Sequence, residues 1–160
     1  MTDTHTLASP DFAAARRHMI ESQLRPSDVS DPVVIAAMAV TPRENFVPAS
    51  HQALAYIDRA VPFTHGRMLN PALSTGLLLT RAELASTDKV LLIGAGTGYV
   101  AALLAGIVAN VVAVEEDRAL VEQAQGNLAG LANVTIVESA LAQGHVAGAP
   151  YDLVIIDGAA

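Results

Sequence analysis

Three glycines and one acidic residue have the types and the spacing in this 160-residue sequence that indicate a binding chemistry. Gly94, Gly96 and Gly98 follow a short apolar run. A helical segment and a second apolar run come next, and Glu115 stands at the end of that second run. Glycines at a turn let a ligand approach the backbone, and the start of the following helix offers N–H groups without intrahelical acceptors. Glu115 lies 115 − 94 = 21 residues after Gly94, a separation at which an acid binds ribose hydroxyls in nucleotide sites. These residues predict a site for a nucleoside-containing ligand.

An alternation of apolar runs and helical segments is expected to hold these residues in place. The apolar runs are too short for helices and are typical of strands that are buried on both faces. We expect strands at residues 90–93, 111–114, 134–137 and 151–156, a helix after the glycine turn and another at 117–128. Strands that alternate with helices pair in parallel, so the sequence predicts an α/β fold with a parallel sheet.

The first 88 residues are predicted to be mainly helical. A capping residue followed by proline indicates a helix start at Asp31-Pro32 and again at Asn70-Pro71. The expected helices span residues 10–23, 31–40, 50–56 and 70–84, and residues 61–70 have mixed turn and strand character. No long linker interrupts the chain. We therefore expect a single domain over 1–160, with a helical lead-in at 1–88 and a ligand-binding core at 89–160.

The composition argues against several classes of partner. The formal net charge is −7 and no basic stripe is present, so no nucleic acid is expected to bind. Cysteine is absent and residues 1–10 lack the apolar segment of a signal peptide, which favours a cytoplasmic location. The apolar stretch 99–114 is shorter than the ~20 residues of a membrane span, so no membrane insertion is expected. The five histidines have no ligand spacing with other donors, which predicts no metal.

The glycine pattern itself bears on which nucleoside ligand binds. A dinucleotide site has Gly-x-Gly-x-x-Gly/Ala, and here Tyr99 occupies the third position, which argues against a nicotinamide-dependent dehydrogenase. The series Gly94-x-Gly96-x-Gly98 instead resembles the first motif of class I methyltransferases, which hold S-adenosylmethionine. The remaining alternative is a glycine-rich turn that binds nothing.

Segments of the first half of the chain strengthen this resemblance. Residues 17–23 (RHMIESQ), 42–48 (PRENFVP) and 55–58 (AYID) occur in the order and spacing of protein-L-isoaspartate O-methyltransferases, as do residues 90–99. The resemblance implies a Rossmann-like class I methyltransferase fold, of which this chain has the first four strands. It also implies S-adenosyl-L-methionine as cofactor and methyl transfer to the carboxylate of an isoaspartyl residue in a damaged protein or peptide, which is a protein-repair reaction.

The resemblance assigns seven residues to the cofactor: Gly94, Gly96, Thr97, Gly98, Tyr99, Glu115 and Glu116. The glycines are expected beside the methionine part and Glu115 at the ribose. Each assignment has a structural alternative. Glu115 could be a solvated acid at a helix start, a description that fits Glu116 and Asp117 better, and Tyr99 could pack under the helix.

Three further residues are candidates for the reaction centre. Methyl transfer to an ionised carboxylate needs in-line positioning and exclusion of water but no general base. Arg67 could bind the substrate carboxylate or be a surface charge, and Asp157 could face the reacting groups or cap a turn. Asn70 is expected to cap a helix first and to contact substrate second.

The sequence also departs from the family that it resembles. The family loop Gly-Gln-Thr-Ile-Ser-x-Pro is here Gly66 to Pro71, one residue shorter and without the reaction-centre Ser. The family usually has an acid two residues before the first glycine, where this chain has Leu92. The Asp that approaches the adenine in the family is missing from residues 139–141. These departures favour an alternative, a divergent member that binds the cofactor but has lost or changed the activity. The fourth strand would form an open apolar edge of the sheet. We therefore expect either that this chain is a fragment of a longer gene product or that another chain, such as a second copy, covers the edge.

Overall fold

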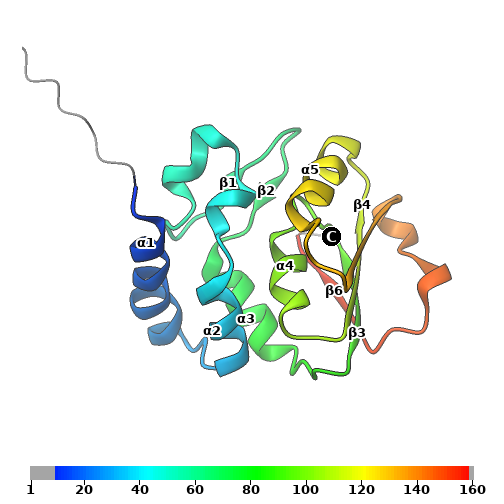
Figure 1. Ribbon diagram of the computed structural model, residues 1–160, viewed down its shortest axis with the longest axis horizontal. Helices are drawn as coiled ribbons and strands as arrows, with labels where there is room; N and C mark the ends of the chain where they lie inside the picture. Colours follow the sequence, from blue (N-terminus) through cyan, green and yellow to red (C-terminus); the bar gives the residue numbers. More distant parts are fainter. Residues whose placement is uncertain (1–9, 159–160) are drawn as a thin grey trace, which may run out of the picture.

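A four-stranded parallel sheet forms the centre of the computed structural model, which describes residues 10–158 (Figure 1). Its order is β5-β4-β3-β6, with bounds β3 (Lys89–Ile93), β4 (Asn110–Glu115), β5 (Val134–Glu138) and β6 (Leu153–Ile156). All neighbouring strands pair in parallel, and Ile93 lies opposite Val114 on one side and Ile156 on the other. The predicted α/β fold and its parallel sheet are confirmed, and the carboxyl ends of the central strands meet at one edge.

The two faces of the sheet are covered differently. One face, which includes the fully buried Val90 and Leu92, packs on α4 (Tyr99–Ala105), α5 (Arg118–Leu128) and the helices of the first half of the chain. On the other face Leu91, Val112 and Val114 form a smaller cluster, which Leu141 and Tyr151 cover. The segment between β5 and β6 crosses this second face with two short 3-10 turns, Leu141–Gln143 and Val146–Gly148 (Figure 1).

The helical lead-in packs on the first face of the sheet. It comprises α1 (Phe12–Met19), a π-helical turn (Ile20–Leu24), 3-10 turns at Arg25–Ser27, Arg43–Phe46 and Ala49–Leu54, α2 (Pro32–Val40) and α3 (Ala72–Arg81). Side chains of Asp11 and Asp31 accept hydrogen bonds from the first N–H groups of α1 and α2, as their positions predict. In the described part of the chain, no helix combines the length and the apolar character that crossing a bilayer requires.

Three expected helices differ from the structure in bounds or type, and the helix expected at 50–56 is a 3-10 turn at Ala49–Leu54. The first α-helix ends at Met19 and continues as the π-helical turn, in which the Ser22 hydroxyl donates to the His18 carbonyl at 2.6 Å. Helix α3 starts at Ala72 and ends at Arg81, and Pro71 occupies its N-cap position without a side-chain bond. The prediction that Asn70 caps this helix is wrong, because its side-chain amide bonds a residue after β6 instead.

Residues 61–69 form a short antiparallel hairpin between the lead-in and α3. Val61 in β1 (Val61–Pro62) pairs with Leu69 in β2 (Met68–Leu69), and both side chains are buried. The connection between the two strands projects towards the carboxyl edge of the sheet (Figure 1). This hairpin therefore brings residues from the first half of the chain to the predicted site.

Strand β6 lies at the edge of the sheet, as expected. It pairs with β3 alone, and the side chains of Val154 and Ile156 are 54% and 52% exposed. An apolar strand whose second edge has no partner can pair there with another strand.

Two glycines that differ in their surroundings give opposite expectations for substitution by alanine. Gly98 has φ +99°, and a Cβ there would lie 2.8 Å from Leu128 Cδ1. We expect Gly98→Ala to lower the free energy of unfolding by about 1–3 kcal/mol, because it adds backbone strain and a steric overlap.

Gly126 is the matched control, because it lies inside α5 and a Cβ there would point into open space. Gly126→Ala is expected to raise the free energy of unfolding by about 0.5–1 kcal/mol through its higher helix propensity. Denaturant titrations of both variants check the pair, and shifts of the same sign would contradict it.

Candidate functional site

A cavity of about 450 Å³ opens at the carboxyl edge of the sheet. Most of its wall comes from the end of β3 and the turn after it, the β1–β2 hairpin and the end of β6, and Glu116 and Leu141 complete it. Ligand sites in open parallel sheets occur at this edge, and small-molecule cavities have this size. The lining residues comprise Phe63, Gly66–Leu69, Ile93–Gly96, Tyr99, Glu116, Leu141 and Ile156–Gly158.

The glycine turn presents bare backbone to this cavity. Gly94 and Gly96 have φ values of +84° and +55°, which L side chains rarely adopt. A Cβ at Gly94 would lie 2.9 Å from the Asp157 carbonyl oxygen, so only glycine fits there. The N–H groups of Gly94 and Ala95 both donate to the Val114 carbonyl, at 2.9 and 3.0 Å. These bonds fix the turn to the end of β4.

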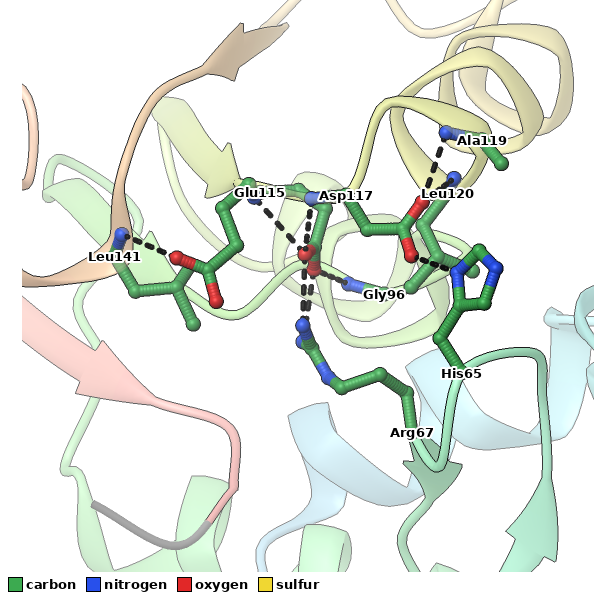
Figure 2. Close-up of polar contacts among 9 residues, drawn as sticks. His65, Arg67, Gly96, Glu115, Asp117, Ala119, Leu120 and Leu141 are labelled. Atoms are coloured by element: carbon green, nitrogen blue, oxygen red, sulfur yellow. Dashed lines mark hydrogen bonds and ion pairs between the residues drawn. The ribbon is translucent and has the colours of Figure 1, made fainter.

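Glu115 lies beside this turn with a fully buried side chain (Figure 2). Its Oε1 accepts from the N–H groups of Glu116 and Asp117, at 2.9 and 3.1 Å, and its Oε2 accepts from the N–H of Gly96 at 2.8 Å. A buried carboxylate is costly without donors, and here three backbone N–H groups supply them. The sequence predicts from spacing alone that Gly94, Gly96 and Glu115 meet, and the structure places them side by side.

Arg67 approaches Glu115 from the hairpin on the opposite side. Its Nη1 and Nη2 donate to Oε1 and Oε2 of Glu115, each at 2.9 Å, in a two-bond ion pair (Figure 2). The Arg67 side chain is 29% exposed and forms part of the cavity wall. In this structure Arg67 is therefore neither a free surface charge nor free to bind a substrate carboxylate.

The two acids after Glu115 have separate contacts. Asp117 stands at the start of α5 as its N-cap residue. Its Oδ1 accepts from the N–H groups of Ala119 and Leu120. Its Oδ2 lies 2.5 Å from Nδ1 of His65, and this hydrogen bond is the main cause that lowers the pKa of Asp117. Glu116 lines the cavity, and its Oε2 accepts from the N–H of Leu141 at 3.3 Å.

The remaining residues of the glycine motif point into the protein. The Thr97 hydroxyl donates to the Phe46 carbonyl at 2.6 Å, and Gly98 packs against Leu128. Neither residue lines the cavity, although the motif groups both with the cofactor. Tyr99 is buried under the helix, with its ring 5.5 Å from that of Phe46, yet it also contributes to the cavity wall.

A chain of polar contacts connects the lead-in with the end of β6. The fully buried Arg43 donates to the carbonyls of Ala55 and Asn70 at 2.7 and 2.6 Å, and its guanidinium lies 4.8 Å from the centre of the Tyr99 ring. Nδ2 of Asn70 then donates to Oδ1 of Asp157 at 2.7 Å. Burial raises the pKa of the Asp157 carboxyl, although Asn70 and the two arginines act in the opposite direction.

Arg43 is a residue of this region that the sequence does not predict. The only available signal is its place in the PRENFVP segment, because nothing in the surrounding sequence indicates that its side chain is buried. Within residues 10–158, no three His, Cys, Asp or Glu side chains are grouped as metal ligands.

Comparisons with known proteins agree with this geometry. Residues 14–160 match the sequence model of the family described as Protein-L-isoaspartate(D-aspartate) O-methyltransferase (PCMT). The chain is 37% identical over 147 residues to protein-L-isoaspartate O-methyltransferase 1 of Rhodopseudomonas palustris, covering 91% of this chain and 60% of that protein. It is 40% identical over 151 residues to the Roseiflexus castenholzii protein-L-isoaspartate O-methyltransferase, covering 93% of this chain and 69% of that protein.

Solved structures give the same result for the fold. One protein-L-isoaspartate O-methyltransferase superposes with a TM-score of 0.78 at 28% identity, over 88% of this chain and 47% of that chain. The Plasmodium falciparum protein crystallised with S-adenosyl-L-homocysteine has a TM-score of 0.73 at 17% identity, over 92% of this chain and 73% of that one. This chain thus spans about half to three quarters of the length of its relatives, and it belongs to the protein-L-isoaspartate O-methyltransferase family.

Proposed function

We propose that this protein is an S-adenosylmethionine-dependent methyltransferase that methylates the carboxylate of isoaspartyl residues in damaged proteins or peptides. Family membership supports this activity, since the curated relatives have the corresponding name. The proposal covers the whole protein, of which the 160 residues contain the glycine turn and Glu115. We place the reaction in the cytoplasm, and we treat residues 1–88 and 89–160 as one unit.

The single observation that supports the cofactor most strongly is the position of Glu115 beside a turn whose Gly94 and Gly96 carry no side chains. Backbone at Gly94 and Gly96 lets the methionine part approach, and the Glu115 carboxylate suits the two ribose hydroxyls. The apolar side chains of Ile93 and Leu141 line the same cavity and suit a purine ring. The solved Plasmodium falciparum relative was crystallised with S-adenosyl-L-homocysteine, the demethylated form of this cofactor.

The bound cofactor supplies an electrophilic methyl group, and the task of the chain is to position the acceptor and exclude water. An ionised carboxylate is already nucleophilic at neutral pH, so the missing family Ser removes a positioning group rather than a base. Asp157 lines this cavity and accepts a hydrogen bond from Asn70, which lines a neighbouring cavity that Asp157 also borders. We assign them to the acceptor side. Arg67 is assigned to the cofactor side because it contacts Glu115.

A second candidate function follows from Asp157. This carboxyl is largely buried and lines the cavity, where an ionised form would repel a carboxylate acceptor. It would suit an acceptor that presents an N–H or O–H group. The second candidate is therefore a member of the family that keeps the cofactor but methylates a different class of acceptor.

The exposed edge of β6 indicates a further contact. Its apolar side chains Val154 and Ile156 are half exposed, and the solved relative at 28% identity is about twice as long as this chain. We propose that another strand pairs with the open edge of β6. This strand comes either from another part of a longer protein or from a second copy of this chain.

Calorimetry with S-adenosyl-L-homocysteine followed by a methylation assay on an isoaspartyl peptide tests the proposed function. Binding together with turnover supports isoaspartyl methylation. Binding without turnover on this peptide favours the second candidate, and the absence of any binding refutes both.

Glu115→Gln is expected to raise the Kd for S-adenosyl-L-homocysteine by about 10–100-fold, because hydrogen bonds to a charged group contribute about 1.5–3 kcal/mol. Glu138→Gln is the matched control, since Glu138 lies opposite Glu115 in the register at the tip of β5 and is exposed. Calorimetry gives both constants, and thermal unfolding confirms that both variants fold. An unchanged Kd in Glu115→Gln would remove this residue from the cofactor site.

Asp157→Asn is expected to raise the free energy of unfolding, and by more at pH 8 than at pH 4, close to the unfolded pKa of an aspartate. Burial raises the pKa of Asp157 in the folded state above the unfolded value of ~3.9. The folded state loses stability as the pH rises through this raised pKa, and the asparagine removes that loss while keeping an oxygen for Asn70.

Denaturant titrations at the two pH values measure this difference, with the exposed Asp58→Asn as control. A gain that is equal at both values would show that Asp157 does not have a raised pKa.

A further inference from the structure

The hairpin 61–69 covers the part of the cavity where the glycine turn and Glu115 meet. Phe63 Cε2 lies 3.0 Å from the position of a Cβ on Gly96, and Arg67 Nη2 lies 3.7 Å from that of a Cβ on Gly94. Both side chains therefore fill the space that the glycines leave open. Figure 2 shows the Arg67 guanidinium below the Glu115 carboxylate, on the side away from the Asp117 backbone N–H.

Glu115 does not depend on Arg67 for its hydrogen bonds. The N–H groups of Gly96, Glu116 and Asp117 occupy one side of the carboxylate, with at least one bond to each oxygen. Arg67 takes the remaining side, which is the side that faces the cavity. A ligand that forms hydrogen bonds with Glu115 from the cavity must therefore use the positions that the guanidinium now has.

We propose that Arg67 is a built-in competitor for the ribose subsite and sets the affinity of this protein for its nucleoside ligand. This inference rests on the proposed function, since the ligand is S-adenosylmethionine or its demethylated product. Binding breaks the two hydrogen bonds between Arg67 and Glu115 and replaces them with bonds from the two ribose hydroxyls. The apparent affinity is then reduced by the fraction of protein in which the ion pair is closed.

The structure gives Arg67 a route out of the site without unfolding of the hairpin. Its side chain is 29% exposed, and residues 64–66 at the tip of the hairpin are exposed. The hairpin has a separate attachment to the same region, the 2.5 Å contact between His65 and Asp117 (Figure 2). Backbone bonds between Phe63 and Arg67, and between Arg67 and Thr64, hold the turn itself. A side-chain rotation of Arg67 into solvent therefore leaves the backbone bonds of the turn in place.

Calorimetry with S-adenosyl-L-homocysteine on the full 160-residue chain tests the proposal. We expect Arg67→Gln to bind the ligand about tenfold more tightly than the unsubstituted protein does, because glutamine has no charge and cannot form the ion pair with Glu115. Arg67→Lys retains the charge without the two-bond geometry, so its Kd should lie between the two. Arg59→Gln is the matched control, since Arg59 is exposed and outside the cavity wall, and its Kd should not change.

A Kd in Arg67→Gln that is equal to or weaker than that of the unsubstituted protein would overturn the proposal. So would a ligand-bound crystal structure in which the pair between Arg67 and Glu115 persists, and this second measurement does not depend on any variant. The proposed function fails separately, if the ligand binds with the predicted order of affinities but no isoaspartyl peptide is methylated. Absence of ligand binding in every variant, Arg67→Gln included, refutes both.

Discussion

The fully buried carboxylate of Glu115 is the constraint on which the rest of this site depends. A charge without solvent contact requires hydrogen-bond donors, and the chain supplies them from three places. The turn after β3 gives the N–H of Gly96, the start of α5 gives two more, and the hairpin gives Arg67. The glycines adopt positive φ because this turn must bring an N–H to the carboxylate and the bare backbone to the cavity at once.

The lead-in is connected to this site by buried polar contacts as well as by apolar packing. Arg43 joins the carbonyls of Ala55 and Asn70, and Thr97 in the glycine turn donates to Phe46. The buried guanidinium of Arg43 donates from two of its nitrogens and lies 4.8 Å from the centre of the Tyr99 ring, whereas its Nη1 has no hydrogen-bond partner among the described residues. The helices before the sheet thus determine where Asn70 and the glycine turn lie, and the first half of the chain takes part in forming the cavity.

Much of the fold could be predicted from the sequence because its signals are local. The four strands are continuous apolar runs, and Asp11 and Asp31 cap the helices that directly follow them. The prediction failed where a distant partner competes with a local one. Asn70 has the sequence position of a cap, yet its amide bonds Asp157, which is 87 residues further along the chain.

The same distinction between local and distant partners applies to the site. One strand–helix–strand unit separates the glycines from Glu115, and the length of this unit is predictable. Their sequence spacing was therefore enough to predict that they meet. The roles of Arg67 and Arg43 depend on how a hairpin and a 3-10 turn pack on the sheet, which spacing does not encode. Asp157 is a mixed case, since the end of its strand was predictable but its burial and its bond to Asn70 were not.

The single-sided attachment of β6 has a consequence for how reactants could be brought together. Asp157 directly follows the last residue of this strand, which within residues 10–158 has β3 as its only partner in the sheet. A strand that joins β6 from its open side would stiffen it and so restrict where the Asp157 carboxyl and the Asn70 amide can move. Completion of the sheet would then also set the positions of these two side chains, so the strand beside β6 would determine how well the cavity is formed.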